Sequence, residues 1–207
     1  MENREPFKLI FNIFHFHGLW DAEKLSRRHK ILLLISSISF VTFTALTTLF
    51  ILQVENTTDL ARLLIVAPVF DLVVIISVLF YLRRNKIKDL IDGMNEIISS
   101  NAVCAAFTDR AFKISKILTY VKMIAAAFTT FGSLIVPLFI EEMIIKTWLP
   151  QSWHDRKDVF YGAWFFENVN IVLYAPLYIA FQEFFLNLLI MINAYQQYFQ
   201  WKIKKMQ

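Results

Sequence analysis

The sequence predicts an all-α fold, an integral membrane bundle of four transmembrane helices with cytoplasmic N- and C-termini. Apolar residues make up 57% of the 207-residue chain, which exceeds the share found in soluble domains. Four apolar stretches reach the length of about 20 residues that a bilayer's hydrocarbon core requires. The 21 Lys and Arg residues are distributed unevenly between the segments that join these stretches. We interpret residues 1–207 as a single transmembrane domain.

The first predicted span, 31–52, is a run of 22 residues without a charged side chain. A basic cluster precedes it and acidic residues follow it. Because basic residues stay on the cytoplasmic side, the N-terminus is predicted to lie inside. The preceding residues 1–30 alternate bulky apolar and polar groups, which favours an amphipathic segment at the inner membrane face with Trp20 at the interface.

The second predicted span, 63–82, is followed by four basic residues and therefore runs from outside to inside. The short loop before it contains the sequon Asn56-Thr57-Thr58, which predicts glycosylation of Asn56 on the external side. Asp71 lies within the span, where a carboxylate is costly. It indicates either a ligand site or a paired acid that faces the bundle, and the second interpretation is favoured.

Residues 83–122 are predicted to form a cytoplasmic segment of two amphipathic helices, interrupted at 99–101, because apolar residues recur at spacings of three and four. The second helix is expected to continue into the third span, 123–145. Small residues in that span are expected to let another helix approach closely; they are Ala125, Ala126, Ala127, Gly132 and Ser133.

The fourth apolar stretch, 160–201, is twice the length that a bilayer requires. We expect a span over 164–186 and a cytoplasmic extension over 187–207. Polar and aromatic residues recur on one face of its outer half at spacings of three and four; they are Glu167, Asn170, Tyr174, Tyr178 and Phe181. This face suits a small, mostly apolar ligand, or else ordinary helix packing, which periodicity alone favours.

The distribution of charge tests this topology. The segments assigned to the inside hold 17 Lys and Arg residues and the two external loops hold 4, as the positive-inside rule requires. The net charge of +4 then needs no nucleic acid as a partner. The sequence contains no nucleophile-base pair, P-loop or His-rich metal cluster, so we expect neither an enzyme nor a cofactor nor a metal. The one cysteine, Cys104, is interpreted as structural.

Several segments resemble one family. They are the FNIFHFHGLW block at 11–20, Trp148-Leu149-Pro150 in the second external loop, and the aromatic entry Tyr161, Trp164, Phe165 into an overlong helix with a Gln-rich, basic end. With these features the chain resembles the first half of an insect odorant receptor. The related insect gustatory receptors share the architecture and are the alternative. The family has seven spans, so the resemblance implies a form truncated after the fourth.

The resemblance implies a plasma-membrane subunit that binds small volatile organic ligands, contacts membrane lipid and gates a cation channel with an odorant receptor co-receptor. In the family, ligands bind in the outer half of the bundle. By topology this implies the ligand-binding residues Phe70, Asp71, Val74, Phe131, Leu134, Leu138, Asn170, Tyr174 and Tyr178. The first span is expected to set the topology without contributing a polar and aromatic face.

A function of another class is also compatible with the sequence. A four-helix membrane protein can associate with full-length receptors and modulate their folding without producing a signal. The long cytoplasmic end of the fourth helix and the small residues of the third favour this hypothesis. Co-purification with a co-receptor, without a ligand-evoked response, would distinguish it from a receptor subunit.

Overall fold

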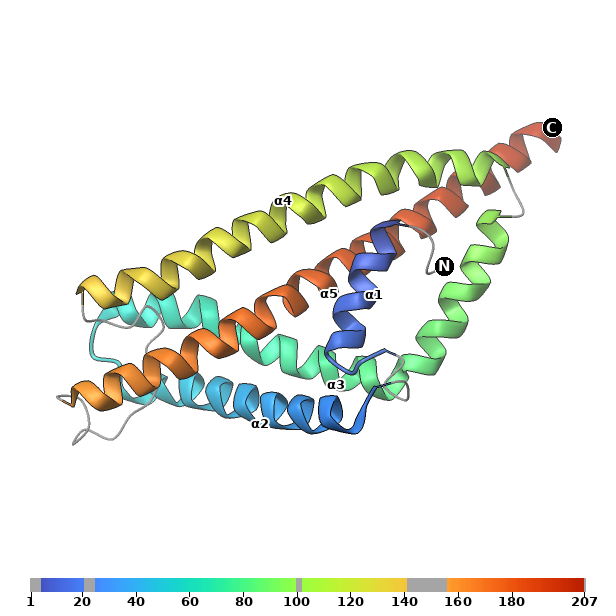
Figure 1. Cartoon of the computed structure of the whole chain (residues 1–207). Helices are drawn as coiled ribbons and strands as arrows, with labels where there is room; N and C mark the ends of the chain where they lie inside the picture. Colours follow the sequence, from blue (N-terminus) through green and yellow to red (C-terminus); the bar gives the residue numbers. More distant parts are fainter. Residues whose placement is uncertain (1–4, 21–24, 100–101, 141–155, 207) are drawn as a thin grey trace. The chain divides into compact units, whose positions relative to one another are not determined.

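The computed structural model describes residues 5–20, 25–99, 102–140 and 156–206 (Figure 1). These residues form helices in the order α1 (Glu5–Phe16), α2 (Arg27–Leu49), the 3-10 helix η2 (Phe50–Gln53), α3 (Thr57–Ser99), α4 (Ala102–Ile140) and α5 (Lys157–Met206). The part of the chain that is described contains no β-strand. The predicted all-α fold class is therefore confirmed.

Within the described ranges, four segments are long and apolar enough to cross a membrane: Arg27–Gln53, Thr57–Met94, Thr108–Pro137 and Lys157–Lys205. The predicted spans 31–52, 63–82 and 164–186 lie within the helices of the structure. The end of the third predicted span, 141–145, lies outside the described residues. The interruption predicted at 99–101 falls where α3 ends and α4 begins. Of the predicted amphipathic segment, 83–99 belongs to α3 and 102–122 to α4, which continues into the third predicted span.

The chain divides into two compact units, which we describe separately. Unit 1 comprises Met1–Ala22, Phe80–Ile124 and Leu177–Gln207. Unit 2 comprises Glu23–Leu79 and Ala125–Pro176. Each of the helices α3, α4 and α5 contributes a segment to both units, whereas α1 belongs to unit 1 and α2 to unit 2.

An aromatic cluster forms the core of unit 1. Phe14 of α1 is fully buried, and its ring centroid lies 4.7 Å from that of Phe80, 5.0 Å from that of Phe181 and 5.8 Å from that of Phe184. These rings come from α1, α3 and α5. Aromatic pairs at such separations stabilise the fold beyond the contribution of the apolar area that they bury. Phe14 therefore attaches the N-terminal helix to the rest of the unit.

The chain leaves α1 through a Schellman motif at Gly18. The Leu19 N–H donates to the Phe14 carbonyl and the Gly18 N–H to the His15 carbonyl, the bond pair that defines this motif. Gly18 has φ of 67°, a conformation that favours glycine. The reversal brings Trp20 back onto the helix, where its ring lies 4.5 Å from that of Phe11.

A second aromatic cluster forms the core of unit 2. Phe40 of α2 stacks on Tyr174 of α5 with a centroid distance of 3.7 Å and an interplanar angle of 8°. Phe43 lies 5.2 Å from Phe70 of α3 and 6.0 Å from Phe166 of α5, between ring centroids. These ring contacts therefore join α2 to α3 and to α5.

Local capping sets where two of these helices begin. Ser26 caps α2, and its hydroxyl accepts from the His29 N–H. Asn56 precedes α3, and its side-chain oxygen accepts from the Thr58 N–H at 2.9 Å. Both residue types favour the N-cap position because they satisfy backbone donors that the first helical turn leaves free.

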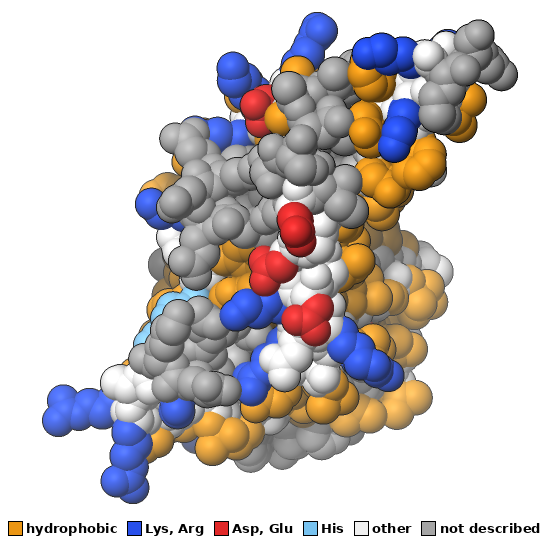
Figure 2. Space-filling view, turned by 90° about the vertical axis from the view of Figure 1, so that its right-hand side faces the viewer, with side chains coloured by type: hydrophobic (Ala, Val, Ile, Leu, Met, Phe, Trp, Pro, Cys, Tyr) orange, Lys and Arg blue, Asp and Glu red, His pale blue; other side chains and the backbone are white. Residues whose placement is uncertain are grey.

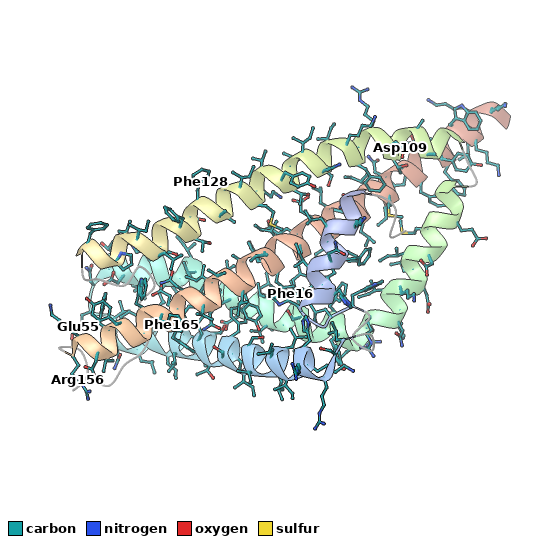
Figure 3. All side chains as sticks on the ribbon, viewed as in Figure 1. Phe16, Glu55, Asp109, Phe128, Arg156 and Phe165 are labelled. Carbon is teal, nitrogen blue, oxygen red and sulfur yellow. The ribbon has the colours of Figure 1, made fainter. Side chains whose placement is uncertain are left out.

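Large hydrophobic side chains are exposed along all four long helices. Figure 2 shows one face of the molecule, on which hydrophobic side chains lie exposed beside charged ones. In the most apolar stretch of α5, 44% of the helix is buried, whereas the corresponding stretch of α4 is only 6% buried. α5 is therefore the main packing helix, and α4 presents most of its apolar surface outward. Phe128 on α4 and Phe165 on α5, both labelled in Figure 3, are examples of exposed aromatic residues.

Candidate functional site

The predicted polar and aromatic face of α5 is buried in unit 2. Asn170 is fully buried and Tyr174 nearly so. The Asn170 side chain donates to the Phe166 carbonyl at 2.7 Å, and its oxygen accepts from the Ser39 hydroxyl at 3.2 Å. The Tyr174 ring is stacked against the Phe40 ring. These two predicted residues are therefore brought together, against α2.

α2 contributes to this site, contrary to the sequence-based expectation. The first span was expected to offer no polar and aromatic face, yet Ser39, Phe40 and Phe43 provide one. That expectation is wrong. The hydroxyl and the rings are spread over an apolar helix in which most residues are Leu, Ile or Thr, so periodicity alone does not single them out.

The residues predicted on α3 lie at different depths of the same unit. Phe70 contacts the cluster, with its ring centroid 6.0 Å from that of Phe40 and 5.2 Å from that of Phe43. Asp71 and Val74 are half-buried. Phe70 is thus the α3 residue whose ring contacts connect it to the face formed by Asn170 and Tyr174.

The residues predicted on α4 do not join this cluster as expected. Phe131 is 62% exposed, so its ring points away from the core of unit 2. Leu134 is half-buried, and the side chain of Leu138 lies outside the described residues. α4 instead lies close to α5 at Ser133, whose hydroxyl is 3.2 Å from the Asn168 side-chain oxygen and 2.7 Å from the Thr130 carbonyl of its own helix.

The small residues predicted to admit a neighbouring helix do so at one position. Ser133 is buried at the contact with Asn168. Ala125 and Ala127 are exposed, and a Cβ atom placed on Gly132 would meet nothing within 4 Å. The contact with α5 is therefore located at Ser133 and does not extend along the whole small-residue stretch.

Tyr178, the last predicted residue on α5, is half-buried and belongs to unit 1. The helical spacing that placed it with Asn170 and Tyr174 is correct, but the face crosses from one unit to the other between Pro176 and Leu177. The site that unit 2 supports therefore consists of Asn170 and Tyr174 with Phe70, Ser39, Phe40 and Phe43.

The segments predicted to lie outside the membrane contain one candidate modification site. Asn56 is exposed at the start of α3, which is compatible with the predicted glycosylation.

Of the second external loop, 146–155 lies outside the described residues. At its described end, a hydrogen bond from Arg156 to Asp158 raises the pKa of the Arg156 guanidinium. Among the described residues, no group of three or more His, Cys, Asp or Glu side chains is placed to hold a metal ion.

A polar cluster that sequence analysis did not identify lies in unit 1. We call it the Glu183 cluster; it consists of Ser115, Thr119 and Lys122 on α4 with Glu183 and Asn187 on α5. The Lys122 ammonium lies 2.5 Å from one carboxylate oxygen of Glu183. The other oxygen accepts from the Thr119 hydroxyl at 3.0 Å. Glu183 and Asn187 are fully buried.

Two signals in the sequence pointed to this cluster. Ser115, Thr119 and Lys122 follow one another at spacings of four and three, and Glu183 and Asn187 are separated by four residues. Each set therefore lies on one face of a helix. A glutamate near the end of an apolar span also indicates a specific partner. The pairing of the two faces requires the tertiary structure.

Comparison with protein-family models, curated proteins and solved structures finds no match to this chain.

Proposed function

We propose that the chain is a multi-pass plasma-membrane subunit of the insect odorant receptor type, with a cytoplasmic N-terminus, that binds a small volatile ligand. With a co-receptor it gates a cation channel. The proposal is supported by the resemblance of the motifs at 11–20 and 148–150, by the bias of basic residues toward one side, and by four helices long enough to span a bilayer. A gustatory receptor is the alternative within the same architecture.

The observation that carries the proposal is the composition of the unit 2 cluster. Stacked and tilted rings from α2, α3 and α5 offer apolar contact area, and a neutral amide lies next to them. Sites for small ligands combine apolar and aromatic walls with a few polar groups that fix orientation. Phe40, Asn170 and Tyr174 are neutral, which suits an uncharged volatile compound. Glu167, three residues before Asn170 on the same helix face, adds a buried carboxyl group that can orient a polar substituent of the ligand.

Ligand binding at this face requires a side-chain movement. The Phe40 ring lies 3.7 Å from the Tyr174 ring and covers it. A ligand of similar size therefore competes with Phe40 for the face of Tyr174. Binding that favours the displaced arrangement shifts the population toward it, and a channel whose open state contains this arrangement opens in response.

Thermal unfolding of the purified chain in lipid nanodiscs tests the binding step without requiring channel activity. Volatile esters, ketones, alcohols and aromatic aldehydes form the panel. We expect at least one class to raise the Tm, because a ligand at 100 times its Kd stabilises the folded state by about 2.7 kcal/mol. Tyr174→Leu should abolish the shift, and the matched control Phe165→Leu, at an exposed position of the same helix, should retain it.

Truncation of the covering ring sharpens this test. Phe40→Ala removes the competitor for Tyr174, so compounds of about benzene size should bind the variant more tightly than they bind the native chain. Co-expression with a co-receptor then tests gating, through a current evoked by the compounds that bind. A panel in which no compound shifts the Tm of either chain would contradict the proposal.

A second candidate function is a membrane partner that associates with full-length receptors and modulates their folding. It is favoured by α4, because the most apolar stretch of this helix is only 6% buried. α4 therefore has a long apolar face available to another helix. Pull-down with a co-receptor distinguishes the two candidates. Association without any ligand-dependent change in Tm supports the partner, and a ligand-dependent change supports the receptor subunit.

A further inference from the structure

In unit 1 a narrow and mostly polar stripe of α4 is buried. Its fully covered members are Thr108, Phe112, Ser115 and Thr119, and Lys122 continues the same spacing of four and three residues. Only one of these five side chains is a large hydrophobe. The attachment of α4 to α5 in this unit therefore depends on polar contacts rather than on apolar area.

Glu183 is the centre of these contacts. Its side chain is 0% exposed, and its carboxylate receives the Lys122 ammonium at 2.5 Å and the Thr119 hydroxyl at 3.0 Å. The Ser115 hydroxyl lies 3.4 Å from the same oxygen that Thr119 contacts. A buried carboxylate is tolerated only when an opposite charge and hydrogen-bond donors replace the water it has lost. The single proton of the Ser115 hydroxyl has a closer acceptor in the Asn187 oxygen, at 2.6 Å. The two principal donors to the carboxylate, Lys122 and Thr119, both belong to α4, so α4 stabilises a charge that α5 carries.

The two ends of the ion pair differ in how far the protein covers them. The Lys122 side chain is 42% exposed, whereas that of Glu183 is 0% exposed. The flexible stem of a lysine allows the ammonium to move toward water. Lys122 can therefore leave the pair by a movement of its own side chain, but Glu183 becomes hydrated only if α4 and α5 separate.

We propose that the Glu183 cluster is a polar latch between α4 and α5 that opens from the Lys122 end. With Lys122 in place, the carboxylate is neutralised and the two helix faces stay closed. When the ammonium withdraws, the uncompensated carboxylate draws water between the helices. The bond from Thr119 to Glu183 and the bond from Ser115 to Asn187 are then exchanged for hydration. The inference concerns unit 1 and does not depend on the function proposed above.

Asn187 identifies the position that water takes in the open form. Its side-chain oxygen lies 2.6 Å from the Ser115 hydroxyl, but its side-chain nitrogen is buried without a hydrogen-bond partner among the described residues. A water molecule at this nitrogen accepts a hydrogen bond from the amide N–H and can donate one to a neighbouring carboxylate. Opening therefore satisfies a donor that the closed latch leaves unused.

A buried reporter cysteine measures the opening. Met191 is fully buried one turn beyond Asn187 on α5. Met191→Cys is placed in a full-length chain in which the one native cysteine is changed by Cys104→Ser. The rate of its reaction with a water-soluble methanethiosulfonate reagent is measured in nanodiscs. The reaction requires exposure of the thiol, so the rate follows the open population.

The latch predicts an unequal effect of its two charges. Lys122→Met keeps the length of the side chain but leaves Glu183 buried and uncompensated, so the labelling rate should rise at least about tenfold. Glu183→Gln leaves Lys122 free to hydrate, so the rate should rise less than about threefold. The double variant removes both charges and should return to within about threefold of Glu183→Gln. Lys113→Met, at an exposed lysine of the same helix, is the control and should leave the rate unchanged.

Other outcomes overturn the proposal. Equal acceleration by Lys122→Met and Glu183→Gln, or a double variant as fast as Lys122→Met, indicates ordinary packing without a latch. An unchanged rate in all variants does the same. If Lys122→Met fails to give a monodisperse helical protein, recovery of that protein by the double variant supports the latch, and failure of the double variant as well overturns it.

Discussion

α4 and α5 are joined by a charged contact in unit 1 and by a neutral one in unit 2. In unit 1 the Lys122 ammonium lies 2.5 Å from the Glu183 carboxylate. In unit 2 the Ser133 hydroxyl lies 3.2 Å from the oxygen of Asn168, whose amide nitrogen donates to the Trp164 carbonyl of its own helix at 2.8 Å. A buried asparagine retains this bond when its neighbour is lost, whereas a buried carboxylate has no donor in its own helix to replace a lost ammonium. The same two helices are therefore joined with very different sensitivity to substitution.

The largest effects should come from the rings, and they should be similar in the two units. Phe14→Ala in unit 1 and Phe40→Ala in unit 2 each remove a buried phenylalanine that contacts other rings. Each should lower the free energy of unfolding by about 3 kcal/mol, from lost burial and a residual cavity. Denaturant titration in mixed micelles, followed by helical circular dichroism, measures this. The control Phe128→Ala, at an exposed position of α4, should change it by less than about 1 kcal/mol. A large effect in only one unit would show that the difference between the units extends to their aromatic cores.

Substitutions at the polar contacts between α4 and α5 should affect stability differently in the two units. Lys122→Met should cost about 2 to 3 kcal/mol, below the full cost of breaking a buried pair because the lysine side chain is 42% exposed. Ser133→Ala should cost no more than about 0.6 kcal/mol, the value typical of one hydrogen bond between membrane helices, because the Ser133 hydroxyl also donates to the Thr130 carbonyl of its own helix. The same titration applies to both variants. Equal losses would contradict the distinction between a charged and a neutral join.

The four spans were predictable because each depends on local composition. Runs of apolar residues and the break at 99–101 appear in the sequence one residue after another, and the helices follow them. The first span was described incompletely. Its contribution at Ser39 and Phe40 becomes visible only when α5 is placed against it.

The candidate site was predictable only in part, for the same reason. Asn170 and Tyr174 were identified by helical spacing, and they do share a buried face. Phe131 was assigned by topology, yet α4 turns it outward and uses Ser133 instead. Glu183 was not identified, because its significance depends on a pairing with Lys122 across 61 positions of the chain. Sequence spacing gives the residues that share a helix face but not the face that lies opposite.

Two glycines, one from each unit, should respond to alanine with opposite signs. Gly18 in unit 1 has φ of 67°, so Gly18→Ala should destabilise by about 1 kcal/mol through strain in the left-handed conformation. Gly162 in unit 2 lies within α5, and an added Cβ would meet nothing within 4 Å. Gly162→Ala should stabilise by about 0.5 to 1 kcal/mol, because alanine loses less backbone entropy in a helix. Thermal unfolding compares the two variants, and a destabilising Gly162→Ala would contradict the helical assignment at that position.

A further small effect tests the neutral contact between α2 and α5 in unit 2. Ser39→Ala removes the donor to the Asn170 oxygen, but Asn170 keeps its bond to the Phe166 carbonyl. The loss should therefore be only about 0.6 kcal/mol. Ser36→Ala is the matched control, since the Ser36 hydroxyl donates to the Leu33 carbonyl of its own helix. The difference between the two variants in the denaturant titration isolates the bond between the helices. A loss at Ser39 that exceeds the loss at Lys122 would reverse the comparison and make the neutral contact the more sensitive one.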